Sequence, residues 1–198
     1  MNLVCDERVF ILKADINDRI LFVNEHWLNF ARENAASGLV EFSLSGQSLW
    51  KFICDDSTVH LYQTMLARAR EEKRSFLIPF RCDSPDCRRF MTMKIIPSDN
   101  ETISFESRIV KLEPRGHVKL LESDRECSEE FIRMCSYCKK VFVSGSDWCE
   151  PEQAITRLEL FSAETLPQIT HTICPSCYEE VIKALRSSEK PDTGKNNV

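Results

Sequence analysis

The sequence predicts an α+β fold: a five-stranded antiparallel sheet with flanking helices, followed by a small, cysteine-rich C-terminal domain. Three observations support this prediction. Strand-like apolar segments occur first as a pair and later as a group of three, two segments with helical periodicity lie between these groups, and two C-x-x-C pairs occupy the last third of the chain.

The first two strands and the first helix are predicted from the start of the chain. Residues 8–15 (RVFILKAD) and 19–23 (RILFV) are rich in strand-forming residues, and residues 16–18 between them predict the turn of a hairpin. Asn24 is the expected N-cap of a helix over residues 25–34. Apolar side chains recur in this helix at i, i+3 and i+4: Trp27, Phe30 and Ala31.

A second helix and three further strands follow. The helix is expected over residues 56–72, with Asp55 or Asp56 as its cap, because apolar side chains recur on one face: Val59, Tyr62, Leu66 and Ala69. Three strand-like segments come next, over 76–81, 89–96 and 103–112. Two strands, then helices, then three strands predict an antiparallel sheet that carries its helices on one face.

The pattern breaks at residues 114–116 (PRG), which we predict to be a domain boundary. The mostly polar residues 117–133 predict a connector helix, and the polar, small residues at the end of the chain predict a disordered tail. The predicted division is a first domain, a helical connector, a cysteine-rich domain and a tail, over residues 1–115, 116–133, 134–185 and 186–198.

Composition limits the location and the partners. The chain has 26 Lys and Arg against 31 Asp and Glu, a formal net charge of -5, so no basic field attracts nucleic acid or an anionic membrane. No apolar run approaches the roughly 20 residues that cross a bilayer, and the N-terminal segment lacks the apolar region of a secretory signal. We therefore expect a cytoplasmic protein that binds neither nucleic acid nor membrane.

The two C-x-x-C pairs supply four candidate metal ligands: Cys135, Cys138, Cys174 and Cys177. Each pair lets two thiolates converge on one ion, and two pairs complete a tetrahedral sulfur shell, which favours Zn²⁺ or an iron–sulfur centre. Because the surrounding segment has few large apolar residues, a structural zinc ion would supply much of its folding free energy. The alternatives are iron at the same site, a redox dithiol, and a Cys3His site in which His171 replaces one cysteine.

Catalytic motifs are missing from the sequence. It contains no nucleophile elbow, no H-E-x-x-H and no glycine-rich phosphate loop, and the whole chain has only five glycines. We therefore expect a protein without enzyme activity.

Several segments resemble those of PAS domains, the sensory modules of many signalling proteins. In the N-terminal part the resemblance rests on four segments, 15–24 (DINDRILFVN), 27–31 (WLNFA), 46–50 (GQSLW) and 80–85 (FRCDSP). In the C-terminal part it rests on 134–140 (MCSYCKK), Trp148 and 171–177 (HTICPSC), which resemble cysteine-rich extensions of PAS sensor proteins. The resemblance covers most of residues 8–182.

The PAS resemblance implies a small cavity between the sheet and its helices, which binds a cofactor or metabolite, or a sheet face that dimerises. His60, on the second predicted helix, and Arg81 are the candidate ligand-binding residues, the first for haem and the second for a carboxylate or phosphate. The competing interpretations are an ordinary partly buried histidine and an arginine paired with Asp83 and Asp86. Cys54 lacks the neighbours of a flavin-binding motif and is expected to be a buried apolar residue.

The predicted function is that of a non-enzymatic cytoplasmic sensory or regulatory protein with a structural zinc ion and an unidentified small-molecule ligand. Because no output domain was found in the sequence, the resemblance implies a signalling partner such as a sensor kinase or regulator, and a homodimer is a further expectation. The alternatives are a ligand-free dimerising scaffold and a thiol redox protein that uses one C-x-x-C pair.

Overall fold

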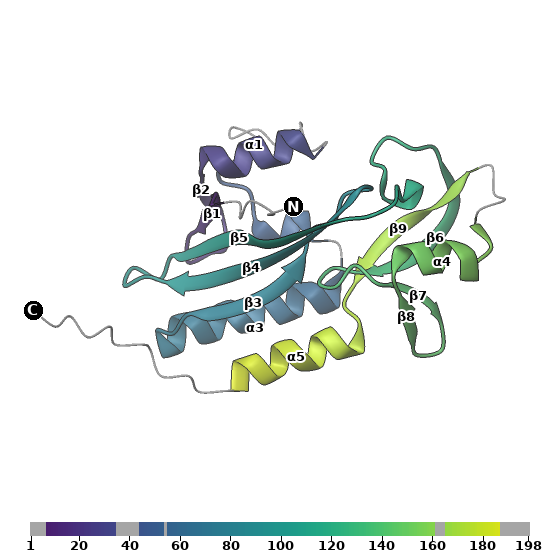
Figure 1. The fold of residues 1–198 in the computed structure, drawn as a ribbon. Coiled ribbons are helices and arrows are strands. Elements are labelled where there is room, and N and C mark those ends of the chain that lie inside the picture. The colour runs from purple at the N-terminus through teal and green to yellow at the C-terminus, as the bar shows by residue number, and fades with distance from the viewer. Residues whose placement is uncertain (1–6, 35–43, 54, 161–164, 187–198) are drawn as a thin grey trace, which may run out of the picture.

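The computed structural model describes residues 7–34, 44–53, 55–160 and 165–186, which form two sheets and the helices around them (Figure 1). Cys54 and residues 187–198 of the predicted tail lie outside the described residues, and Arg186 is the last residue of a helix. No described helix is both long enough and apolar enough to cross a bilayer.

The first sheet has five antiparallel strands in the order β2-β1-β5-β4-β3. Its strands overlap the five predicted segments: β1 (Val9–Ala14), β2 (Ile20–Val23), β3 (Phe76–Arg81), β4 (Cys87–Pro97) and β5 (Ile103–Pro114). The pairing of β1 with β5 places the N-terminal hairpin beside the later three strands. The predicted α+β arrangement is confirmed.

The described helical segments between β2 and β3 flank this sheet: α1 (Glu25–Glu33), the 3-10 helix η1 (Leu49–Phe52) and α3 (Asp56–Glu72). The Asn24 side-chain oxygen accepts a hydrogen bond from the Trp27 N–H at 3.0 Å, so α1 begins where the sequence predicted. Asp55 caps α3, because its carboxylate accepts from the Thr58 N–H at 2.8 Å. The side chains that α3 buries are Thr58, Leu61, Met65, Leu66 and Ala69.

A second, four-stranded sheet has the order β8-β7-β6-β9. Its strands are β6 (Cys127–Cys135), β7 (Val141–Ser144), β8 (Asp147–Cys149) and β9 (Leu166–Thr172). Strands β6 and β9 are parallel, and the connection between them contains β7, β8 and the helix α4 (Pro151–Arg157). The last helix, α5 (Pro175–Arg186), returns to the first sheet and packs against β3 (Figure 1).

The predicted connector helix over residues 117–133 is wrong. Only η2 (Lys119–Leu121), a single 3-10 turn, is helical there, and residues 127–133 belong to β6. Met134 and Ile132 on β6 pack into the core beneath the second sheet, whereas Phe131 is 63% exposed. The polar character of this segment therefore reflects a strand with one solvated face, held by pairing with the distant β9.

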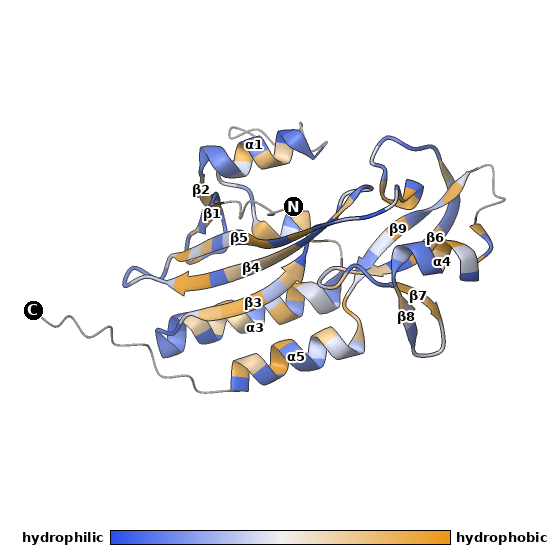
Figure 2. Ribbon diagram, viewed as in Figure 1, coloured by the Kyte–Doolittle hydropathy of each residue, from blue (hydrophilic) through white to orange (hydrophobic). Residues whose placement is uncertain are grey.

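One buried cluster joins the two parts of the molecule. It combines side chains of the first sheet and α3 with Cys135, Cys174 and Cys177 and with Val181 and Leu185 of α5. Apolar and polar residues interchange along α5, as expected for a helix with one buried face (Figure 2). A separate cluster lies against the second sheet and includes Leu120, Met134, Val141 and Ala154. The cysteine-rich part therefore shares a core with the first sheet.

Candidate functional site

The four predicted metal ligands come together at the junction of the two parts. The sulfur atoms of Cys135, Cys138, Cys174 and Cys177 all lie within 4.8 Å of one another. The Cys138 and Cys174 Sγ atoms, from different pairs, are 3.8 Å apart. When four sulfur atoms each lie about 2.3 Å from a tetrahedral zinc ion, any two of them are separated by about as much as these two Sγ atoms are. Among the described residues His171 is not a member of this cluster and lies exposed on β9.

Backbone hydrogen bonds hold each cysteine pair in a tight turn. The Cys135 N–H donates to the Lys140 carbonyl at 2.8 Å, and the Lys139 N–H donates back to the Cys135 carbonyl at 3.0 Å. Lys139 has φ +60°, so this turn uses the left-handed conformation. The Tyr178 N–H donates to the Cys174 carbonyl at 3.0 Å, which places the second pair at the start of α5. The Cys174 N–H also donates to the Cys135 Sγ at 3.4 Å and ties the two pairs together.

The crowded thiols oppose one another's ionisation. Hydrogen bonds from Cys138 and Cys177 lower the pKa of Cys135. The hydrogen bond with Cys135 in turn raises the pKa of Cys138 to about 12. Hydrogen bonds with Cys135 and Cys138 also raise the pKa of Cys177. A divalent cation would remove this conflict, because it stabilises all four thiolates at once. The donor set therefore fits a soft divalent ion such as Zn²⁺.

Arg81 lies in a buried ion-pair network between the two parts. Its guanidinium contacts Asp83, as one of the two interpretations predicted, and donates to Glu150, just before α4, at 2.9 Å. The second predicted partner, Asp86, is replaced by this glutamate. Asp83 also pairs with Arg115 at 3.2 Å, and the side chains of Arg81, Asp83 and Arg115 are each less than a tenth exposed. This network connects β3 of the first sheet to the second sheet.

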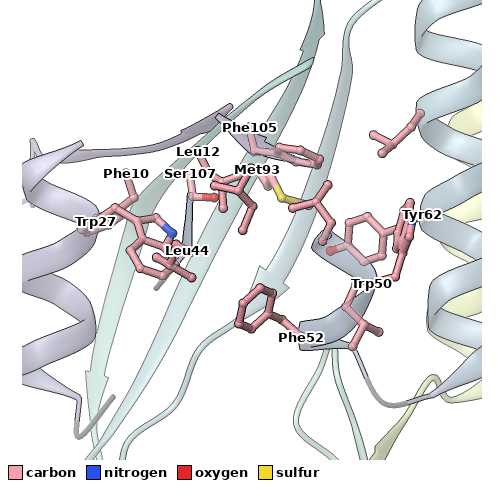
Figure 3. A pocket seen from close by; sticks show the side chains of 14 residues that line it. Phe10, Leu12, Trp27, Leu44, Trp50, Phe52, Tyr62, Met93, Phe105 and Ser107 are labelled. Atoms are coloured by element: carbon pink, nitrogen blue, oxygen red, sulfur yellow. The ribbon is translucent and has the colours of Figure 1, made fainter. Parts of the chain in front are cut away.

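An apolar cavity of about 240 Å³ lies between the first sheet and its helices (Figure 3). Fourteen side chains from β1, β2, β4, β5, α1, η1, α3 and the segments beside them line it. Aromatic rings form much of the wall: Phe10, Trp27, Trp50, Phe52, Tyr62 and Phe105. No charged side chain lines the cavity among the described residues.

A few polar atoms face this apolar space. The Ser107 hydroxyl is on β5, the Tyr62 hydroxyl is on α3, and the indole nitrogens belong to Trp27 and Trp50. Burial raises the pKa of Tyr62, so its hydroxyl is neutral at neutral pH. These residues were not predicted from the sequence to line a cavity. The aromatic residues at 50, 52 and 62 are the signal that could have indicated an apolar binding site.

His60 occupies a different surface from the cavity. It is exposed on the outer side of α3 and lies beside Ile173, Pro175 and Tyr178. Neither candidate ligand-binding residue, His60 or Arg81, is among the described residues that line the apolar cavity.

Comparison with known proteins gives structural neighbours only. No family model matches the chain, and no curated protein matches it. The first neighbour is a domain of an HTR-like protein from Haloarcula marismortui, with 22% identity and a TM-score of 0.36, covering 52% of this chain and 98% of that one.

Two further neighbours are bacterial. The sensory box sensor histidine kinase from Vibrio cholerae has 11% identity and a TM-score of 0.39, covering 54% of this chain and 85% of that one. The PAS domain of the Cronobacter turicensis RpfR quorum-sensing receptor, in complex with BDSF, has 12% identity and a TM-score of 0.41, covering 55% of this chain and 100% of that one. Each similarity extends over about half of this chain.

Proposed function

We propose that this chain is a cytoplasmic, non-enzymatic sensory module of the PAS type, which binds a small uncharged molecule and passes a signal to a partner protein. The observation that carries the proposal is the cavity of about 240 Å³ between the five-stranded sheet and its helices. Apolar cavities with a few convergent polar groups are the usual sites of small-molecule binding.

The cavity wall supports a particular class of ligand. An engineered apolar cavity of about 150 Å³ holds benzene, so this larger one accommodates a bigger aromatic or short aliphatic molecule. Burying an unpaired charge is very costly, and no charged side chain among the described residues lines the cavity to offset it. The ligand is therefore uncharged, with at most a polar group or two for Ser107 and the neighbouring indole nitrogens to contact.

We assign a structural zinc ion to the cysteine cluster. Four thiolates close the tetrahedral shell and leave no open position for substrate, which is the arrangement of structural sites. The ion would hold the turn after β6 to the first turn of α5, because Cys135 and Cys138 come from the former and Cys177 from the latter. Its chemistry there is that of a crosslink, with a binding free energy of roughly 10–16 kcal/mol.

The second sheet and α5 are the proposed output elements. A ligand changes the output only if it binds one conformation better than another, and these elements are attached to the cavity-bearing part by the cysteine cluster and the Arg81 network. The proposed partner is a signalling protein such as a sensor kinase or regulator. The alternative to such a partner is a second copy of this chain, in a homodimer.

Native mass spectrometry of the full chain, purified without added metal, tests the metal and the subunit count together. One zinc ion per chain and a colourless protein are expected. A visible absorption band with stoichiometric iron would contradict the zinc assignment.

Fluorescence of 1-aminonaphthalene, a small uncharged aromatic probe, tests the cavity. The zinc-loaded protein should bind it, and Ser107→Leu, which adds a bulky side chain to the cavity wall, should weaken binding at least about ten-fold. Arg108→Leu is the matched control, because Arg108 is the exposed neighbour on the same strand. Equal weakening by both variants, or no binding to the unmodified protein, would contradict the proposal.

A further inference from the structure

Two stacked tyrosines connect the cavity with the cysteine cluster. Tyr62 lines the cavity from α3. Its ring stacks on that of Tyr137, with centroids 6.2 Å apart and an interplanar angle of 27°. Tyr137 lies between Cys135 and Cys138 in the first C-x-x-C pair. One ring of the stack therefore belongs to each candidate site.

The position of the Tyr137 ring is set by the cysteine turn. Tyr137 is only 4% exposed, and its carbonyl oxygen accepts a hydrogen bond from the Arg81 N–H at 2.7 Å. The adjacent Ser136 N–H donates to the Thr172 carbonyl, also at 2.7 Å. These bonds anchor the backbone of the turn, and an ion on the cysteines would in addition fix the sulfur atoms on both sides of Tyr137.

Packing continues from the cysteines to the cavity wall. The buried cluster that contains Cys135 and Cys174 also contains Leu66, Met93 and Phe105, all of which line the cavity. Protein interiors are close-packed, so a displacement at one end of such a cluster must be accommodated by its neighbours. If the cysteine turn loosens, the support behind Tyr62 is lost and the cavity wall can relax.

We propose that the cavity and the cysteine cluster are energetically linked sites. A metal ion on the four cysteines raises the affinity of the cavity for an uncharged apolar ligand, and the ligand raises the affinity of the cysteines for metal. Tyr62 and Tyr137 act as positioning residues between them. This inference rests on the proposed function, and because linkage is reciprocal the two affinities change by one common factor.

The test is a binding cycle on the full chain. The Kd of 1-aminonaphthalene is measured by fluorescence with one zinc ion per chain and again after zinc removal under reducing conditions. The zinc affinity is measured by competition with a chromophoric chelator, with and without saturating 1-aminonaphthalene. We expect both affinities to change by about five-fold or more, and by equal factors. An unchanged Kd and an unchanged zinc affinity would overturn the linkage.

Two variants separate a specific connection from general unfolding of the metal-free protein. Tyr137→Leu removes the stacked ring and should reduce the linkage factor to nearly one, while both sites still bind. Phe142→Leu is the matched control, since it breaks a different aromatic pair, with Trp148, and Phe142 does not line the cavity. It should retain the full factor. A full factor in Tyr137→Leu would overturn the role of the tyrosines.

The proposed function fails under different results. If 1-aminonaphthalene does not bind the zinc-loaded protein, the cavity assignment is wrong. If it binds with the same Kd in both metal states, the cavity assignment stands and only the linkage is wrong.

Discussion

The two sheets of this protein differ in how their strands come together. In the first sheet β1 pairs with β2, β3 with β4 and β4 with β5, each next to its neighbour in sequence, and only the β1–β5 pairing is distant. In the second sheet β6 pairs with β7 and β7 with β8, again neighbours in sequence, but the distant pairing, of β6 with β9, is parallel and spans two strands and a helix. Local turns therefore specify most pairings in both sheets, and the difference lies in the distant pairing, which is antiparallel in the first sheet and parallel, through a crossover connection, in the second.

The two parts also differ in what fills their junction. The first sheet and α3 pack large apolar side chains together, Ile95 from the sheet and Leu61 and Met65 from the helix. Where α5 and β6 meet this core, cysteine sulfur atoms lie beside the apolar side chains of Val181 and Leu185. A metal ion at that point would supply a constraint that a small sheet with a limited core of its own otherwise lacks. We therefore expect the first part to be held by apolar burial and the second by burial together with metal coordination.

The largest effect is expected for Cys174→Ser. Three thiolates leave the shell incomplete, so the variant should lose its metal ion and the second sheet should lose protection from amide hydrogen exchange, because binding free energy is folding free energy at such sites. Metal analysis and hydrogen exchange measure this. Cys127→Ser, at an exposed cysteine outside the cluster, should keep one ion per chain.

Full zinc content in Cys174→Ser would contradict the ligand assignment. Loss of protection in β1 and β2 as well would show that the two sheets unfold as one unit, and the contrast drawn between them would then be wrong.

The next largest effect is expected for Arg81→Met. Removing one partner of a buried, hydrogen-bonded charge network typically costs about 3–5 kcal/mol in the free energy of unfolding. Urea denaturation measures this. The matched control is Arg68→Met, which removes a more exposed i,i+4 pair with Glu72 and should cost about 0.5 kcal/mol or less. Equal losses in the two variants would mean that the junction network adds no stability.

A smaller effect, confined to the first sheet and α1, is expected for Asn24→Ala. The Asn24 side chain accepts hydrogen bonds from the N–H groups of Trp27 and Ile11, and donates to the Val9 carbonyl at 2.8 Å. Losing a cap and its connection to β1 should lower the free energy of unfolding by about 2 kcal/mol. Thermal denaturation checks the value. An unchanged midpoint of thermal denaturation would show that the Asn24 cap does not contribute to the stability of this part.

The smallest effect concerns pH and His117, which bridges Glu122 at 2.7 Å and Asp86 at 2.9 Å. These hydrogen bonds raise the pKa of His117, so the protonated form stabilises the fold. The contribution is fully present below the unfolded pKa of about 6.5 and disappears as pH rises through the higher folded value. The stability difference between the unmodified protein and His117→Gln, from denaturation at several pH values, should shrink from pH 6 to 9. A difference that grows with pH would contradict this.

Much of the first sheet could be predicted because its determinants are local. The strand-forming residues over 76–81 match β3, and Asn24 and Asp55 act as caps because cap chemistry involves only the next few residues. The C-x-x-C spacing also indicated the cluster correctly, since the turn itself converges each pair of sulfur atoms. The identity of the ion stays a prediction.

The features that could not be predicted are those set by distant contacts. Residues 127–135 form a strand because β9 pairs with them, and the sequence of the segment itself does not indicate this pairing. Arg81 selects Glu150 over the nearby Asp86 because folding places α4 beside β3. The cavity is likewise assembled from several elements, so its wall becomes evident only in three dimensions.

The hydrogen bond from the Arg81 N–H to Tyr137 has a consequence for association between chains. Backbone N–H groups alternate in direction along a strand, so Leu77, Pro79 and Arg81 are the positions of β3 that turn away from β4. Proline has no N–H to offer, and that of Arg81 is already engaged. The outer border of the first sheet is thus largely closed to an incoming strand, which protects the protein against aggregation by strand addition at β3.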